Sequence, residues 1–529
     1  MRKLLAGLVA VLSLSLVTAQ LSVAAVTPGT KCSKAGATSN YNGKKYTCVK
    51  SGKKLLWNKG VALPKPKPAT TPTPLPTPAQ TLVPTPTPTE SVKVPLQPFT
   101  YSDPCEKDPE TPAEWLNFES WYRGVGNDCV GPFRLVETEL TKNVPTTPTS
   151  FNPIDIAKCK IPNNPLKQNT LGFETDPGRL SYFNNSRHPS PDTVYQVLPI
   201  FTLDAPDRGT RPAEDYKKYF DFMTAWTKNA SDNGSKVEFR VPDKYLEFPE
   251  NIASYNLIHE RKEEDAIRFN AALTKYVDSK IDFKGTNVVI VLLPPGSKGG
   301  IIQQAGLHRI KTNEGEFIIS TFPPYTIESG FSGTNFLHPM WWIHELQHVG
   351  IGFDDNNQTD EDAPHQWGVI SRYAATDLLG WQKWLASFWS DNQVICLSKT
   401  ASSTAWIIPS QIKNSGKKLI AIPVDSKRVI LIESMRSTGL NFKMPISTQG
   451  ALVYIVDTTI TKSHDGIRLL LPGNRKTTTL VPKGATQNTV KFNNADAPLK
   501  KDDYLIFEGI KISVVESGDF GDVIKVEKA

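Results

Sequence analysis

A proline-rich stretch near the N-terminus most constrains how this chain can fold. From position 64 to position 98, 12 of 35 residues are proline, and many alternate with threonine. Because proline lacks a backbone donor, such a segment favours an extended polyproline II spacer, which at ~3.1 Å per residue reaches about 110 Å. We therefore expect residues 61–98 to be a linker between a small N-terminal module and a much larger C-terminal part.

The first 25 residues are expected to be an export signal. Arg2 and Lys3 precede an apolar run from Leu4 to Val17, and Ala24 and Ala25 are small residues that suit signal peptidase. No other apolar run approaches the ~18 residues that a membrane span needs, so we expect no transmembrane segment. These features predict a secreted, extracellular protein that can form disulfide bonds.

Residues 26–60 are expected to be a small β module with a disulfide between Cys32 and Cys48. Asn42-Gly43 lies between these cysteines and favours a hairpin turn. The module has eight lysines and no acid, and only two further basic residues precede it. In the rest of the chain the 53 acids outnumber the basic residues, so the net charge of +7 is local and does not indicate nucleic-acid binding. The lysines either contact an anionic cell envelope or form a solvated face.

The large part is predicted to be α+β, with a mixed region at 99–396 and an all-β region at 397–529. Apolar periodicity predicts strands at 194–204 and 287–294 and helices at 216–228 and 263–277. After Cys396, short apolar runs at 419–424, 429–433, 451–457 and 504–516 favour a β-sandwich. Cys105, Cys129, Cys159 and Cys396 allow three disulfide pairings, among which the sequence does not choose.

The strongest functional signal is the run from Trp342 to Val349, WIHELQHV. On a helix, residues i and i+4 share one face, so His344 and His348 can bind one metal ion while Glu345 points into the same cleft. In zinc peptidases, zinc lowers the pKa of bound water and polarises the scissile carbonyl, and the glutamate moves the water proton to the leaving amine. The motif therefore predicts His344 and His348 as zinc ligands and Glu345 as the catalytic base. Two surface histidines on an ordinary helix are the alternative.

A third protein ligand is expected just beyond this helix. Asp354 follows His348 by six residues, past Gly350 and Gly352, which can end the helix and turn the chain back toward the metal. We predict Asp354, with competing nearby candidates at Asp355, Asp360, Glu361, Asp362 and His365. The same acidic run, 354–362, also suits a structural calcium ion or a solvated loop. His338 and Tyr373 are weaker candidates for contacts with the substrate.

Several segments together resemble secreted bacterial metallopeptidases related to immune inhibitor A. The segments are HELQHVGIGFD from His344, QWGVIS from Gln366, LGWQKW from Leu379, VILIESMR from Val429 and GALVYIVD from Gly450. The resemblance covers roughly residues 190–520. It implies a zincin-like, metzincin-type catalytic domain at 99–396, an acidic third ligand, a following turn with Trp and Met, and a β-sandwich-like domain at 397–529. Ile351 and Ile370 stand where the family has Gly and Met.

The resulting hypothesis is a secreted zinc metalloendopeptidase, a hydrolase that cleaves peptide bonds in extracellular proteins. Two other functions remain open. One is a catalytically weak or inactive peptidase fold that acts as an envelope-binding or adhesion protein, and the other is an amidase that acts on cell-wall peptides.

Overall fold

The chain forms two compact units, Met1–Ser91 and Val92–Ala529. The computed structural model describes residues 28–32, 34–41, 44–52, 54–62, 138–166, 170–173, 192–232, 234–257, 263–297, 308–322, 339–355, 360, 362–364, 367–370, 377–441, 444, 446–480 and 492–529. The predicted export signal, residues 63–98 of the predicted linker, Cys105 and Cys129 lie outside the described residues.

The N-terminal unit contains a small antiparallel sheet. Its strands are β1 (Thr38–Tyr41), β2 (Lys44–Ser51), β3 (Lys54–Trp57) and β4 (Val61–Ala62), and β2 pairs with each of the others. Tyr41 pairs with Lys44 at the β1–β2 connection, and the predicted Cys32–Cys48 disulfide is confirmed. Tyr46 and Cys48 are buried, so the disulfide contributes stability that so small a core lacks.

The C-terminal unit begins with a six-stranded sheet in the order β6-β5-β8-β10-β9, with β7 paired to β5. All neighbours are parallel except β9, which pairs antiparallel with β10 at the edge. The strands are β5 (Thr193–Phe201), β6 (Val237–Arg240), β7 (Leu246–Glu247), β8 (Val288–Leu292), β9 (His308–Thr312) and β10 (Gly315–Thr321). All five residues of the central strand β8 are buried, which explains its continuous apolar run.

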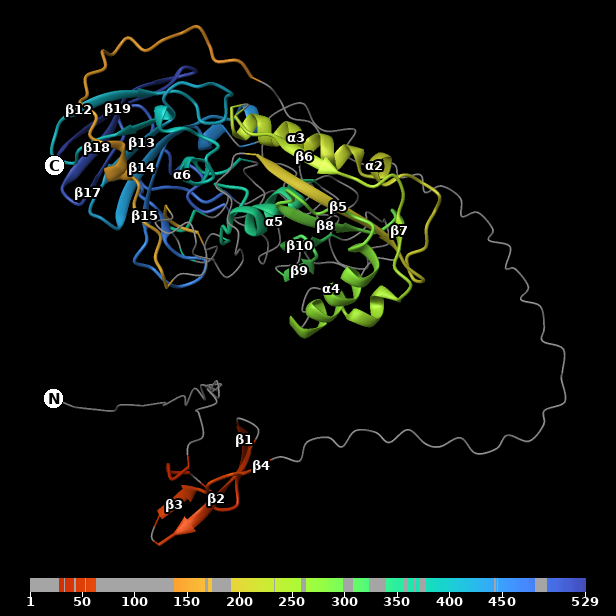
Figure 1. Cartoon of the computed structure of the whole chain (residues 1–529). Coiled ribbons are helices and arrows are strands. Elements are labelled where there is room, and N and C mark those ends of the chain that lie inside the picture. The colour runs from red at the N-terminus through yellow and green to blue at the C-terminus, as the bar shows by residue number, and fades with distance from the viewer. Residues whose placement is uncertain are drawn as a thin grey trace, which may run out of the picture. The chain divides into compact units, whose positions relative to one another are not determined.

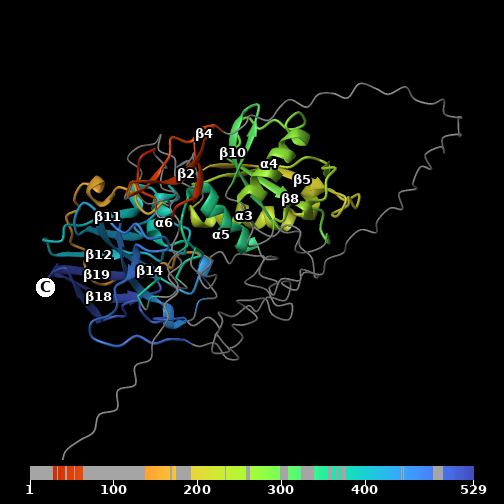
Figure 2. The ribbon, with the colours of Figure 1, turned by 90° about the horizontal axis from the view of Figure 1, so that it is seen from below.

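Helices cover both faces of this sheet (Figures 1 and 2). Helices α3 (Lys217–Ala230) and α5 (Pro339–Ile351) lie on one face and α4 (Glu263–Val277) lies on the other. The short helix α2 (Pro212–Asp215) precedes α3, and α6 (Gly380–Leu385) contacts a later sheet. Ile290 of β8 shares a core with Trp226 of α3 and Trp342 of α5, whereas the neighbouring Val291 shares another with Phe269 of α4. Successive strand residues thus point to opposite helical layers.

Two antiparallel-rich sheets follow. One has the order β11-β13-β14-β15-β16 and the other β12-β19-β18-β17. Their bounds are β11 (Val394–Cys396), β12 (Ser403–Ile407), β13 (Leu419–Pro423), β14 (Arg428–Met435), β15 (Gly450–Asp457), β16 (Ile467–Leu469), β17 (Tyr504–Phe507), β18 (Ile510–Gly518) and β19 (Gly521–Lys528). Apolar side chains of both sheets, among them Ile432 and Ile524, form one core between them.

The five-stranded sheet is buried on both faces. In β14, Ile430 and Ile432 contact the core shared with the four-stranded sheet, while Val429 and Leu431 belong to the core that includes α3, α5 and α6. A disulfide between Cys159 and Cys396 joins this sheet to the segment before β5. Residues on either side of position 396 therefore share one hydrophobic core.

Most predicted elements are confirmed, and the unit is a mixed α+β structure with more sheet than helix. The helix at 263–277 has the predicted bounds, and the helix at 216–228 and the strands at 194–204 and 287–294 agree within a few residues. The run at 504–516 is two strands, because Glu508 and Gly509 adopt positive φ and form a turn. Among the described residues, no helix has the length and apolar character that a membrane span requires.

Candidate metal centre

Helix α5 is held in place by aromatic packing. Trp342 is almost fully buried, and its ring lies 4.5 Å from that of Phe322, just after β10, and 4.6 Å from that of Tyr219 in α3. Ile343 and Leu346 are buried in the same core. Because these side chains fix the rotation of the helix, the positions of His344 and His348, one turn apart, are fixed as well.

Each histidine is oriented by a backbone carbonyl. Nδ1 of His344 donates to the carbonyl of Val369 at 2.6 Å, and Nδ1 of His348 donates to the carbonyl of Phe353 at 2.7 Å. A neutral imidazole with its proton on Nδ1 has its lone pair on Nε2. In metal-binding histidines the ring nitrogen that does not bind the metal usually donates such a hydrogen bond, which fixes the orientation of the ring.

The two Nε2 atoms and one carboxylate oxygen converge on a common point. The Nε2 atoms lie 3.0 Å apart, and Oδ1 of Asp355 is 3.2 Å from Nε2 of His344 and 3.6 Å from Nε2 of His348. These are the three groups in the described chain that are close enough to share a metal ion. A zinc ion with tetrahedral angles and bonds of ~2.0–2.1 Å holds its ligand atoms about 3.3 Å apart, so the three groups fit such an ion.

The electrostatics of the cluster favour a bound cation. Two facing Nε2 lone pairs repel each other unless a proton or a metal ion lies between them. Burial alone lowers the pKa of His344, but the hydrogen bond to Asp355 and the charges of Glu345 and Asp355 outweigh it and raise the pKa to about 9. Burial raises the pKa of Asp355, but His344 and His348 reverse this effect and lower it to about 2. A metal ion would therefore have to compete with protons for the two histidines and the carboxylate, and its binding would release protons.

Glu345 lies next to this cluster. It follows His344 on the helix, it is half-buried, and its negative charge contributes to the raised pKa of His344. A carboxylate in that position can accept a proton from a water molecule at the metal and release it to a leaving group. The structure thus brings together His344, His348 and Glu345, as the motif predicts.

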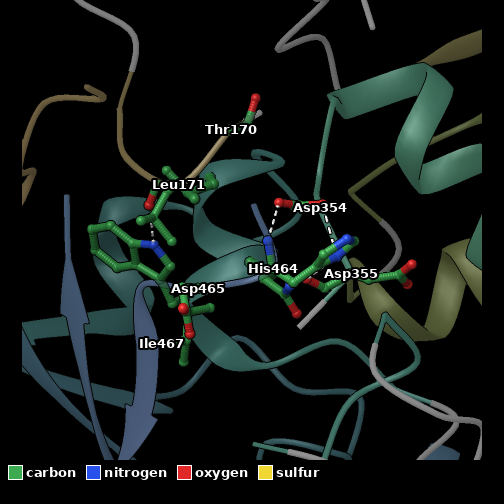
Figure 3. A pocket seen from close by; sticks show the side chains of 10 residues that line it. Thr170, Leu171, Asp354, Asp355, His464, Asp465 and Ile467 are labelled. Atoms are coloured by element: carbon green, nitrogen blue, oxygen red, sulfur yellow. Dashed lines mark hydrogen bonds and ion pairs between the residues drawn. The ribbon is translucent and has the colours of Figure 1, made fainter. Parts of the chain in front are cut away.

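The third ligand differs from the sequence prediction. The carboxylate of Asp354, which we predicted, contacts His464 in the connection between β15 and β16 (Figure 3), and it also accepts from the hydroxyl of Ser463. The neighbouring Asp355, a competing candidate, is the acid that joins the histidine pair. Helix α5 ends at Ile351, and Gly352 has a φ of 82°, so the chain turns at the second of the two glycines named in the prediction.

The rest of the acidic run contacts Arg468 of β16. Its guanidinium donates to Asp362 at 3.0 Å and to Asp360 at 3.3 Å. These carboxylates therefore have a cationic partner in the chain, and the calcium site proposed for residues 354–362 stays a prediction. Glu361 and His365, like His338 and Tyr373, lie outside the described residues.

The turn predicted after the metal helix lies beneath His344. Ile370, at the position where the resemblance implies a methionine, is fully buried, and the preceding carbonyl of Val369 is the one that orients His344. An apolar residue therefore supports this side of the centre. Sequence reasoning missed His464, because nothing in a short polar turn indicates contact with a segment about 110 residues earlier.

A scan against protein-family models finds no match for this chain, and a comparison with curated proteins finds none either. The geometry and chemistry of the centre are therefore the basis on which a function is assigned.

Proposed function

We propose that the protein is a zinc-dependent endopeptidase in which His344, His348 and Asp355 hold the metal. The observation that carries this proposal is the convergence of two Nε2 atoms and one carboxylate oxygen at 3.0–3.6 Å, beside Glu345. Two imidazoles exclude calcium, which takes oxygen ligands. The same donors also suit non-haem Fe(II), but an acid directly beside the ligands favours hydrolysis. The resemblance to the immune inhibitor A family supports the same conclusion.

Each residue has a definite part in peptide hydrolysis. A bound zinc ion acts as a Lewis acid, which makes water a nucleophile at neutral pH and polarises the scissile carbonyl. Glu345 accepts a proton from the attacking water and delivers it to the leaving amine nitrogen. The carbonyls of Val369 and Phe353 keep both histidines in the tautomer that has its lone pair on Nε2.

The first experiment is elemental analysis of the purified full-length protein, with casein hydrolysis measured with and without a chelator. About one zinc per chain and cleavage that the chelator abolishes would support the proposal. Zinc without casein cleavage would indicate a narrower substrate such as a cell-wall peptide. Iron in place of zinc would refute the peptidase assignment and favour a non-haem iron enzyme. No metal at all would refute it and favour the binding protein.

The variant Glu345→Gln tests the base separately from the metal. We expect it to retain zinc and to lose roughly 10² to 10⁴-fold in kcat, the usual contribution of general acid–base catalysis. Glu264→Gln is the matched control, since Glu264 is exposed on α4, whose core lies on the other face of the sheet. Wild-type turnover in Glu345→Gln would exclude Glu345 as the base.

Export and contact with the cell envelope belong to the same proposal. The two disulfides among the residues that the structure describes are typical of an oxidising compartment. Lys44, Lys45 and Lys50 are exposed on β2, in a module that contains no acid. Co-sedimentation of the full chain with purified anionic cell walls, at low and high salt, tests this contact, which should weaken as salt rises.

A further inference from the structure

We infer that Asp354 and His464 are positioning residues that place Asp355 at the metal, so that a loop of the C-terminal five-stranded sheet forms part of the centre. This inference rests on the proposed metal site and concerns how the third ligand is held. It also explains why two adjacent aspartates follow the metal helix: one is a ligand and the other an anchor.

The anchor is a dense set of contacts around the Asp354 carboxylate. Its Oδ2 accepts from the backbone N–H of His464 at 2.6 Å and from the hydroxyl of Ser463 at 3.0 Å, and its Oδ1 lies 3.2 Å from Nδ1 of His464. The Asp354 side chain is only 13% exposed, whereas the His464 side chain that it contacts is 54% exposed. The segment after Gly352 is also held by the buried side chain of Phe353 and by the bond from His348 to the Phe353 carbonyl, but the contacts of Asp354 are the ones directly beside Asp355.

His464 also contacts the ligand residue itself. Its Nδ1 lies 3.3 Å from the carbonyl oxygen of Asp355, so one imidazole spans the anchor and the backbone of the ligand. The φ of His464 is 63°, a left-handed conformation that a residue with a side chain adopts at a cost. In this conformation His464 contacts both Asp354 and Asp355, and these contacts offset the cost of the left-handed backbone.

The loop that presents His464 is itself closely packed. Gly466 has a φ of 117°, and a Cβ at this position would lie 2.3 Å from a methyl carbon of Leu171. Asp465 pairs with Lys462 at 2.8 Å, inside the same loop. Downstream, the backbone N–H of Leu469 donates to the carbonyl of Asp362 at 2.7 Å. The acidic segment is therefore attached to β16 and its preceding loop at both ends.

Further contacts hold the segment from the opposite direction. Thr170 donates from its backbone to the carbonyl of Gly352 at 2.7 Å and from its hydroxyl to that of Ile351 at 2.9 Å. These bonds fix where the helix ends, but they do not reach Asp355. Besides the two histidines, the contacts nearest to Asp355 in the described chain come from Asp354 and His464, which is why we assign the positioning role to them.

The test compares variants of the full-length protein by zinc affinity, measured in competition with a chromophoric chelator, and by the visible spectrum of the Co(II)-loaded protein. We expect Asp354→Ala and His464→Ala to weaken zinc binding by about 10 to 100-fold, the usual effect of losing a partner that orients a ligand. We also expect both to change the Co(II) spectrum, which reports ligand geometry. Asp355→Ala should lose at least as much affinity as either.

Asp425→Ala is the matched control. Asp425 also accepts backbone N–H groups in a turn, from Lys427 at 2.8 Å and Arg428 at 2.9 Å, but that turn joins β13 to β14 and contains no residue of the metal centre. We expect its zinc affinity and Co(II) spectrum to match the wild type. Near-UV circular dichroism checks that each variant is folded. If Asp354→Ala does not fold, His464→Ala still tests the inference, because the His464 side chain is 54% exposed and its removal should disturb the fold less.

Two results would overturn the inference while leaving the peptidase proposal in place. The first is wild-type affinity and spectrum in folded His464→Ala. The second is a larger loss of zinc affinity in Asp354→Ala than in Asp355→Ala. Asp354 would then be the ligand, and removing the His464 side chain would free the Asp354 carboxylate for the metal instead of weakening the site. A wild-type protein that binds no zinc would overturn both proposals.

Discussion

The buried ion pair between Asp232 and Lys418 provides a quantitative test of how the two halves of the large unit are joined. Asp232 follows helix α3 with a φ of 54°, and its carboxylate accepts from Nζ of Lys418 at 2.6 and 2.9 Å and from the backbone N–H of Asn414 at 2.9 Å. The two side chains are 7% and 1% exposed. Asp232→Asn keeps the size of the side chain and tolerates the left-handed backbone, so it removes mainly the charge.

In the part of the chain that the structure describes, Lys418 would then have only neutral acceptors, the carbonyl of Ile412 at 2.6 Å and the amide oxygen that Asp232→Asn leaves in place. Removing one partner of a buried pair costs about 3–5 kcal/mol, because an uncompensated charge remains inside the protein. We therefore expect the free energy of unfolding to fall by about that amount near pH 5, well below the pKa of Lys418, which is about 8. At pH 7 the variant can release the Lys418 proton, which limits the loss to about 1–2 kcal/mol. Urea unfolding of the full chain with intact disulfides, followed by tryptophan fluorescence, measures it.

The loss should depend on pH in a definite direction. Burial lowers the pKa of Lys418 from 10.5 to about 8, although Asp232 opposes the shift, and removing Asp232 lowers it further. Since the folded variant releases the Lys418 proton at a lower pH than the folded wild type, its loss of stability shrinks as pH rises toward about 8 and levels off above that, where Lys418 is neutral in both folded proteins. Asp425→Asn is the control, since Asp425 and Arg428 form an exposed pair worth at most about 1 kcal/mol. A loss in Asp232→Asn no larger than the control's, or one that grows as pH rises, would refute this reasoning.

Three further predictions concern the metal centre and the disulfide that joins the sheets. Zinc at 1,000 times its Kd should stabilise the wild type by about 4 kcal/mol in thermal unfolding, and His344→Ala should abolish the effect. Gly352→Ala, at a φ of 82°, should cost about 1–2 kcal/mol and weaken zinc binding in the chelator assay; Gly209→Ala, at a φ of 74° in an open loop, should show similar strain with unchanged affinity. Replacing both Cys159 and Cys396 by Ser opens a loop of 237 residues and should lower the free energy of urea unfolding by about 5 kcal/mol; a loss below 1 kcal/mol would show that chain entropy is not its main contribution.

The sequence predicts elements best where one periodicity dominates. Helix α4 has its predicted bounds because apolar residues such as Phe269 and Leu273 recur along one helical face and are buried against one sheet. Strand β8 is equally clear because it is buried on both faces. The run from 504 to 516 was predicted less well, since two strands with similar alternation differ from one long strand only in the turn at Glu508 and Gly509.

Some residues of the candidate metal centre could be predicted from their spacing on one helix, and others depend on contacts with a distant part of the chain. His344, Glu345 and His348 were predictable because their spacing on one helix sets their geometry. The choice between Asp354 and Asp355 was not, because adjacent carboxylates have the same chemistry and the contacts that separate them come from Ser463 and His464. Only the folded chain brings those residues to the end of α5.

The two faces of the five-stranded sheet explain why the C-terminal strands matter to a centre that lies outside them. A sheet exposed on one face would alternate apolar and polar residues. Strand β14 instead contains the unbroken apolar run 429–432 and β15 the run 451–456, which indicates apolar partners on both faces. One partner is the four-stranded sheet, and the other is the core that contains Trp342 and Leu346 of the metal helix. The same strands carry the β15–β16 loop that holds Asp354. A chain ending at Cys396 would lose both supports, so we expect the metal helix and its third ligand to need the strands that follow.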